Sequence, residues 1–388
     1  MGDSYDAIVI GAGVVGVSIA FHLAERGLKP VILERKEIAC GATGRSSGLV
    51  RMHYALEAEA RLAWISFQYF HDWQARVGGE CGFTRTGFLY IDVPAHDTQV
   101  RANVETHKRI GISSEIVSAA DVKRIAPAFT TGDFSIAAYE PESGYADPVL
   151  TSNSFLAAAK ARGAVYFQDC EVTGISSTAG KVTGVETSRG KYSAPVIVNA
   201  AGAWAGPLGR MVGIKLPLDT WTHDVAHLRR PEEIGDHPTV IDSALSMYFR
   251  PDTGGLTLVA LEDNNRLGEA PDSDTAYVAR DFVQRAVDRI CQRMPAMEKG
   301  SLQSTHVGRD GLTPDQRAIL GSAGPQGYYL ATGFSGTGFK TSPAVGLCMA
   351  ELIVDGASRT MDISSFGLER FERGLLLKGE HDYGNLWR

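Results

Sequence analysis

The sequence predicts an α/β fold in two domains, and three observations support this prediction. First, a chain of 388 residues exceeds the size of one ordinary compact domain. Second, residues 6–34 follow the pattern strand, glycine turn, helix and strand, with β-branched runs on both sides of an apolar helical stretch. Third, short strands, loops and helices mix over 83–149 and 215–310, where the regular alternation of strand and helix is lost.

Each domain is expected to come from separated stretches of the chain. Outside the two mixed regions, 195–199 reads as a buried strand, and 327–355 reads as a strand, a glycine-rich turn and a helix over 343–355. The sequence therefore predicts a discontinuous first domain and a second, α+β domain with a mixed or antiparallel sheet. The first comprises 1–82, 150–214 and 311–388, and the second comprises 83–149 and 215–310.

Composition narrows the class of function. The formal net charge of −7 and the pI near 5.8 do not suggest the basic face that a nucleic-acid partner needs. The apolar runs are shorter than the ~18 residues of a membrane-spanning helix. A strand-like run at 7–10 leaves no room for a signal peptide, so a cytoplasmic protein is expected. Five scattered cysteines and ten histidines lack CxxC and HExxH spacing, so no metal site is predicted.

A glycine motif opens the first predicted helix. Gly11, Gly13 and Gly16 form GxGxxG between a strand and a helix, where they allow a tight turn, close approach of a pyrophosphate and close helix–strand packing. Glu34 closes the second strand, where a carboxylate accepts hydrogen bonds from the ribose of an adenine dinucleotide. The first domain is therefore Rossmann-like and binds a dinucleotide. The carboxylate disfavours NADP, but this unit leaves FAD and NAD both open.

Three further blocks identify the cofactor through a family resemblance. The loop Arg35–Gly48, read as RKEIACGATGRSSG, is similar to a stretch of the D-amino-acid-oxidase superfamily of flavoenzymes, and so are 198–204 and 333–340. The resemblance implies FAD as cofactor, and backbone N–H groups at the start of the last helix suit the negative charge that flavin reduction creates. Beyond the glycine motif and Glu34, the implied cofactor residues are Arg35, Gly41, Thr43, Arg45, Ser46, Ser47, Val172, Ala201, Gly202, Trp204, Gly336, Gly338, Phe339 and Lys340.

Within the superfamily, the chain most resembles sarcosine oxidases, both monomeric and beta-subunit types. This likeness places Arg51 and Lys340 as the two cations that hold a substrate carboxylate, which suits the bidentate guanidinium and the compact ammonium. It places Tyr248 over the flavin and His223 on a strand that faces the substrate. As structural alternatives, the two cations could form surface salt bridges, and the tyrosine could belong to the core.

The chain also departs from monomeric sarcosine oxidase. That enzyme attaches its flavin to a cysteine shortly before Thr-Pro-Asp, whereas 305–312 contains no cysteine. Neither His53 nor His306 lies in a histidyl attachment pattern, so the FAD is expected to be non-covalent. The family's oxygen-activating lysine also has no counterpart, because 240–262 contains no lysine.

The resemblance implies oxidation of the C–N bond of a small, N-substituted amino acid such as sarcosine or iminodiacetate. The resulting imine hydrolyses to a 2-oxo acid and an amine, and O2 takes up the electrons to give H2O2. The alternative is an amino acid dehydrogenase, or a subunit of a heteromeric complex, that passes electrons to another acceptor. The expected partners are the amino acid, an electron acceptor and, in the second case, a partner subunit.

Overall fold

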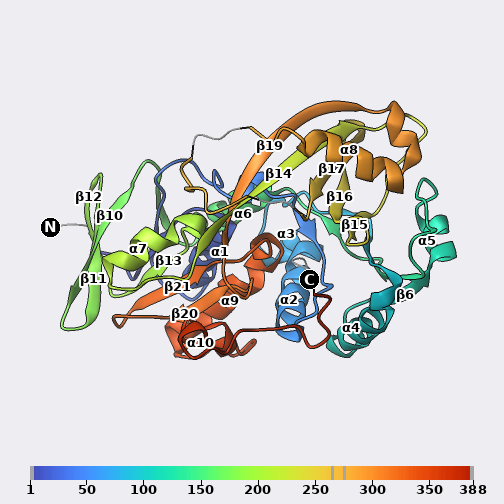
Figure 1. The fold of residues 1–388 in the computed structure, drawn as a ribbon. Coiled ribbons are helices and arrows are strands. Elements are labelled where there is room, and N and C mark those ends of the chain that lie inside the picture. The colour runs from blue at the N-terminus through green and yellow to red at the C-terminus, as the bar shows by residue number, and fades with distance from the viewer. Residues whose placement is uncertain (1–3, 264–265, 274–276, 385–388) are drawn as a thin grey trace.

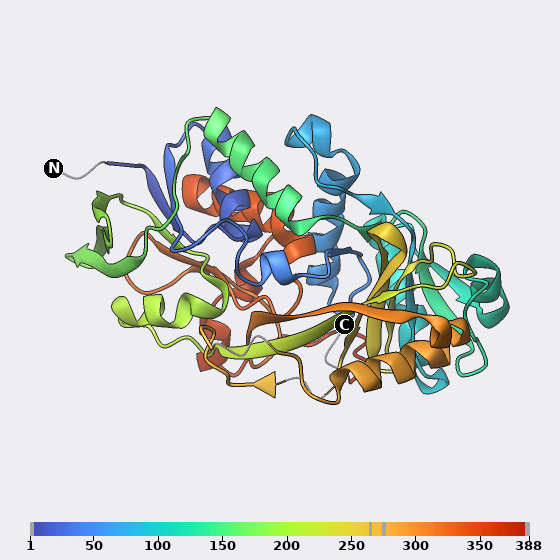
Figure 2. The same ribbon diagram turned by 90° about the horizontal axis from the view of Figure 1, so that it is seen from above.

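The computed structural model describes all residues except 1–3, 264–265, 274–276 and 385–388. Two large sheets dominate it, with helices on their outer surfaces (Figure 1). Two long antiparallel strands, β14 (Asp219–Arg229) and β19 (Ser301–Leu312), extend from the second sheet along the molecule, as Figure 2 shows from above.

The first sheet is mainly parallel. Its strands follow the order β20-β21-β13-β1-β2-β9, and only the β20–β21 pair within this path is antiparallel. Their bounds are Ile319–Ser322, Tyr328–Thr332, Ile197–Asn199, Ala7–Ile10, Pro30–Leu33 and Val165–Phe167. Strands far apart in sequence therefore meet at one sheet, with the glycine turn directly after β1.

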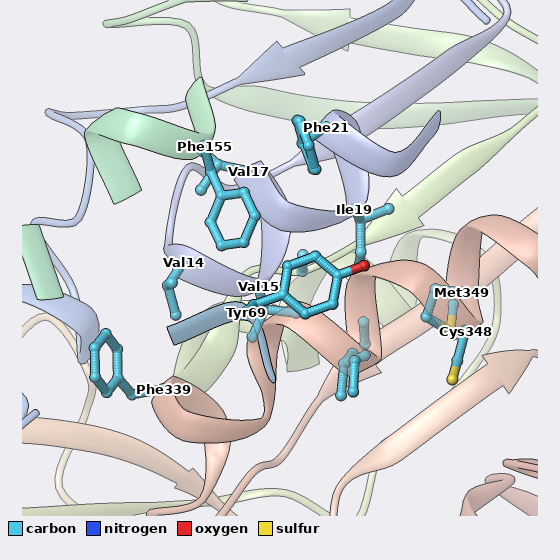
Figure 3. Close-up of a cluster of buried hydrophobic side chains, with 14 of the residues drawn as sticks. Val14, Val15, Val17, Ile19, Phe21, Tyr69, Phe155, Phe339, Cys348 and Met349 are labelled. Atoms are coloured by element: carbon cyan, nitrogen blue, oxygen red, sulfur yellow. The ribbon is translucent and has the colours of Figure 1, made fainter. Parts of the chain in front are cut away.

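Both faces of this sheet are covered, because alternate strand residues point to opposite sides. Ala7 and Val9 join a core with helices on one face, shown in part in Figure 3, whereas Ile8 and Ile10 join a separate core on the other face. The first face carries α1 (Val14–Glu25), α2 (Glu57–His71), α6 (Pro148–Ala161) and α9 (Gly338–Asp355). The second carries α7 (Ala205–Met211) and the sheet of β10 (Val172–Thr178), β11 (Lys181–Thr187) and β12 (Gly190–Ser193).

The second sheet is mixed and mostly antiparallel. Its strands follow the order β18-β14-β17-β16-β15-β5-β7-β6, and β19 pairs with β14. Besides β14 and β19, the strands are Arg266–Leu267, Leu256–Leu261, Met247–Asp252, Thr239–Asp242, Phe88–Ile91, Ile136–Glu140 and Glu115–Ser118. Its outer face packs on α8 (Phe282–Arg293) through Phe282, Ala286 and Ile290. The opposite face is therefore available to the site.

Besides six 3-10 helices, the described residues contain four further helices and one small sheet. They are α3 (Trp73–Arg76), α4 (Asp97–Ile110), α5 (Ala119–Ile125), α10 (Glu369–Glu372) and a small sheet of β3 (Leu49–Val50), β4 (Thr84–Arg85) and β8 (Gly144–Tyr145). Within the described residues, no helix combines the length and apolar character that crossing a membrane requires.

The predicted fold class is confirmed: a mainly parallel, Rossmann-like sheet stands beside a mixed sheet. The five domain ranges stay a prediction. One helix start was wrong, because α9 begins at Gly338 and not at 343. Pro343 lies inside this helix, where it cannot donate to the carbonyl of Phe339. The hydroxyl of Ser342 donates to that carbonyl at 2.8 Å, so the helix tolerates the proline.

Candidate functional site

A cavity of about 600 Å³ lies between the glycine turn and the inner face of the second sheet. Every predicted site residue except Gly16 lines it, including Arg51, Lys340, Tyr248 and His223. Residues that lie up to about 330 positions apart in the chain therefore share one space. Their individual roles stay predictions.

The glycine turn is shaped for close backbone packing. Gly11 has φ +106°, and a Cβ there would lie 2.7 Å from the carbonyl oxygen of Ala200. A Cβ on Gly16 would lie 2.0 Å from the carbonyl oxygen of Gly11, so this glycine serves helix–strand packing and has no place at the cavity wall. Gly13 lines the cavity as N-cap of α1. The turn thus fits the close approach of a pyrophosphate.

Glu34 is a nearly buried carboxylate at the end of β2. Its Oε2 accepts from the backbone N–H of Ala12 at 2.8 Å, and its Oε1 accepts from that of Lys36 at 2.8 Å. A carboxylate has about four acceptor positions, so capacity remains for ribose hydroxyls. Glu34 therefore stabilises the glycine turn in addition to the role predicted for it.

Arg35 forms an ion pair across the cavity wall. Its guanidinium lies 4.7 Å from the ring centre of Trp204 and donates to Asp272, with one contact at 3.2 Å. This hydrogen bond is the main reason why the pKa of Asp272 is lowered. Asp272 also lines the cavity, and no motif in the sequence predicted this position.

The loop after β2 contacts helix α1 and the second sheet. The hydroxyl of Thr43 accepts from the N–H of Val14 at 3.1 Å, so this helix N-terminal donor already has a partner. The carbonyl of Ser47 accepts from Nε of Arg250, a residue of β16. His306 lies 3.2 Å from the carbonyl oxygen of Arg45 through Nε2. These contacts fix the loop along the cavity.

Asp310 is a second residue that the sequence did not reveal. It lies on β19, lines the cavity, and accepts from the N–H of Gly311 at 2.7 Å and of Gly336 at 2.6 Å. Burial raises the pKa of its carboxyl. Asp310 therefore holds the glycine-rich turn that precedes α9. A partner of this kind is set by tertiary pairing, which no local pattern encodes.

Arg51 and Lys340 are both buried at the cavity, with exposed fractions of 3% and 7%. Arg51 follows β3, donates to the carbonyl of His53 and lies 4.2 Å from the ring centre of Tyr54. Lys340 lies in the first turn of α9, and its Nζ donates to the carbonyl of Gly336 at 3.0 Å. Because both side chains are buried, the alternative of surface salt bridges is excluded for them.

The pKa of Lys340 is lowered well below its usual value. Burial is the main cause, and the charge of Arg51 adds to it. The carboxylates of Glu59 and Asp310 act in the opposite direction. Two positive groups thus lie in one poorly hydrated region, which an incoming anion would stabilise.

Tyr248 and His223 belong to the inner face of the second sheet. Burial raises the pKa of Tyr248, and a side-chain hydrogen bond to Ser47 lowers it by a smaller amount. Burial lowers the pKa of His223 to about 3, so its imidazole is neutral near pH 7. Both side chains therefore offer uncharged hydrogen-bonding groups to the cavity.

A buried polar cluster lies behind Arg51. Among the described residues, potential ligand atoms of His53, His107 and Glu140 lie within 4.8 Å of one another. Burial is the main cause that lowers the pKa of both histidines, and the charge of Arg51 lowers each of them further. The same positive charge opposes a metal ion here. Spacings of 54 and 33 residues along the chain explain why no motif indicated this cluster.

The family comparison covers most of the chain. The sequence model described as "FAD dependent oxidoreductase" matches residues 6–352. The residues present fit that cofactor: a glycine turn that leaves no room for side chains, an acidic residue at the end of β2 and a cavity of about 600 Å³. FAD is therefore the cofactor of this fold, as the resemblance predicted, and non-covalent attachment remains a prediction.

Several known proteins are similar to this chain. Mitochondrial sarcosine dehydrogenase from Mus musculus is 30% identical over 387 residues, which are 95% of this chain but 42% of that protein. The chain thus spans less than half the length of that relative. Sarcosine oxidase subunit beta from Arthrobacter sp. is 27% identical, with 96% of this chain and 93% of that subunit covered. L-proline dehydrogenase from P. horikoshii is 27% identical with a TM-score of 0.89, covering 96% of this chain and 99% of that one.

Proposed function

This chain belongs to the FAD dependent oxidoreductase family, and we propose that it oxidises the C–N bond of a small amino acid. The expected substrate is N-substituted, such as sarcosine or iminodiacetate. The product is an imine, which water hydrolyses to a 2-oxo acid and an amine. FAD, when bound, supplies the two-electron acceptor for this oxidation.

The pair of buried cations at the cavity carries the proposal. Arg51 offers a planar fork for two carboxylate oxygens, and Lys340 adds a point charge from the first turn of α9. Two such cations without a carboxylate on the ligand would remain poorly compensated, because burial and mutual repulsion act on both. The substrate carboxylate supplies this compensation and fixes the adjoining carbon at a constant place in the cavity.

The remaining side chains orient the amine. Neutral His223 and the hydroxyl of Tyr248 line the same cavity. Both can exchange hydrogen bonds with the substrate amine without adding charge to the site. Since the pKa of His223 is about 3, it does not act as a general acid near pH 7. We accordingly assign no proton transfer to His223 and propose that the substrate amine reacts with its lone pair free.

Anaerobic mixing of the holoenzyme with candidate substrates tests this proposal, because loss of flavin absorbance needs no assumed electron acceptor. Sarcosine and iminodiacetate should reduce the flavin, whereas dimethylamine, which lacks a carboxylate, should not. Equal rates with dimethylamine would remove the carboxylate requirement and with it the proposed substrate class.

A dehydrogenase, or a subunit of a heteromeric complex, is the second candidate. It is favoured by the absence of lysine from 240–262, where the oxygen-activating residue of the resembled oxidases is expected. The relatives include proteins named as a dehydrogenase and as an oxidase subunit. Admitting air to the reduced protein separates the two: prompt reoxidation with H2O2 supports the oxidase, and a flavin that stays reduced supports the second candidate.

A further inference from the structure

The inner face of the second sheet presents a row of residues to the cavity. Cross-strand pairing aligns Val225 with Ala260, Ala260 with Tyr248, Tyr248 with Ile241, and Ile241 with Tyr90. Directly paired residues project from the same face of a sheet. Val225, Tyr248 and Ile241 reach the cavity wall. The strand register thus places the side chains of Val225, Tyr248 and Ile241 in one continuous surface at the cavity, which consists of two aliphatic groups and a phenol.

This surface lies next to the carboxylate-binding cations. Val225, Ile241 and Tyr248 pack in one buried cluster with Leu49, which also lines the cavity. Phe88 belongs to the same cluster, and its ring centre lies 5.7 Å from the guanidinium carbon of Arg51. A ligand held by Arg51 therefore places its other end against a largely apolar wall.

The wall itself offers no positive charge to a second anion. Burial raises the pKa of Tyr248, so its phenol stays neutral and contributes no positive charge. Glu262, which follows β17, is buried near Tyr248, and burial raises the pKa of its carboxyl well above the usual value, so it also adds no positive charge. Two other arginines of the cavity already face carboxylates: Arg35 pairs with Asp272, and Arg309 lies 3.7 Å from Glu269. Lys36 and Arg45 also line the cavity, but both are exposed side chains of the loop after β2 and do not belong to the cross-strand row.

We propose that the substrate group beyond the carboxylate is small, apolar and uncharged, and that Val225, Ile241 and Tyr248 select against a second carboxylate. This inference rests on the proposed function and narrows it. An N-methyl group or a short hydrocarbon ring suits the wall, because it buries apolar surface there. The second carboxylate of iminodiacetate would lose water against Val225, Ile241 and Tyr248, and none of these side chains carries a positive charge that could replace that hydration.

Two measurements on the holoenzyme test the inference. In anaerobic flavin reduction, sarcosine and proline should each show a specificity constant at least about 100-fold above that of iminodiacetate, because discrimination of this kind reflects an unpaired buried charge. In equilibrium titrations followed by flavin absorbance, propionate should bind at least about tenfold more tightly than malonate, which replaces the methyl group by a carboxylate.

A variant adds the missing charge. Ile241→Lys places an ammonium group among the cross-strand residues that line the cavity. It should reduce the ratio of the specificity constants for sarcosine and iminodiacetate by about tenfold or more. Ile241→Met is the matched control, because it has a similar length and no charge, and it should keep the preference. If Ile241→Lys fails to bind FAD, the titration of the unmodified protein with propionate and malonate still tests the proposed selection against a second carboxylate.

The outcomes separate the two levels of the argument. If iminodiacetate reduces the flavin as well as sarcosine does, or malonate binds as tightly as propionate, the apolar selection is wrong while the proposed function stands. If none of the three amino acids reduces the flavin but propionate still binds better than malonate, the proposed reaction is wrong and the apolar wall is supported. If none of the three amino acids reduces the flavin and neither acid binds, both are overturned.

Discussion

Replacing Lys340 by Met tests the charge at the centre of the proposed site. Met preserves much of the buried side-chain volume and removes the ammonium. Truncating one partner of a buried charge pair costs roughly 2–5 kcal/mol. Here we expect the lower half of that range. Burial and the charge of Arg51 already disfavour the charged form of Lys340, so part of the free energy of its attraction to the carboxylate is used to protonate it. About 2–3 kcal/mol corresponds to an increase of about 30- to 150-fold in the substrate dissociation constant.

The assay is the substrate dependence of anaerobic flavin reduction, measured from pH 6 to pH 10. Because the pKa of Lys340 is lowered in the free protein and an incoming carboxylate raises it again, binding takes up a proton. Affinity should therefore fall with rising pH in the unmodified protein, and this decline should be lost in Lys340→Met. Lys160→Met, at an exposed position of α6, is the control. A Lys340→Met protein with unchanged affinity would refute the carboxylate clamp.

Three other predictions concern the cofactor and the buried acids. Glu34→Gln should weaken FAD binding by about 10- to 150-fold, since a charge-assisted hydrogen bond contributes roughly 1.5–3 kcal/mol. Equilibrium dialysis measures this affinity. Glu171→Gln, at the same cavity, is the control and should change the FAD affinity little. Acid precipitation should release intact FAD, whereas flavin retained in the pellet would contradict non-covalent binding. Burial raises the pKa of Glu140 from 4.5 to about 7, so the folded state holds its proton more tightly and stability falls between about pH 4.5 and 7. Glu140→Gln should remove up to about 3 kcal/mol of that decline in urea unfolding, and exposed Glu105→Gln should not.

Local pattern was sufficient for the dinucleotide end of the site. The glycine turn and Glu34 lie within one βαβ unit, where spacing alone determines which atoms meet. Asp310 and Asp272 were not predictable in this way, because their partners lie 26 and 237 residues away. The start of α9 was misplaced for a different reason. Proline is common in the first turn of a helix, so a start at 343 fits the local pattern, but α9 begins five residues earlier and the hydroxyl of Ser342 donates to the carbonyl that Pro343 cannot reach.

The apolar wall shows the limit of sequence interpretation most clearly. Val225, Ile241 and Tyr248 belong to three different strands. Val225 and Ile241 read locally as ordinary core residues, and Tyr248 was indicated only by the family resemblance. Only the register across β14, β17, β16 and β15 aligns them beside the cations. A shift of one residue in any of these pairings would turn the side chains of the shifted strand away from the cavity, to the outer face of the second sheet. Substrate selection is thus encoded in strand pairing, which the linear pattern leaves open.

The position of Lys340 indicates that this site stores unfavourable electrostatic energy in the free protein. A lysine in the first turn of a helix opposes the helix dipole, burial removes its hydration, and Arg51 repels it. A sequence selected for stability alone would place an acidic or neutral residue there. Glu59 and Asp310 offset only part of this cost, since the pKa of Lys340 remains well below its usual value. A bound carboxylate would reduce all three unfavourable electrostatic terms together. The electrostatic free energy that destabilises the free protein therefore contributes to its affinity for an anionic substrate.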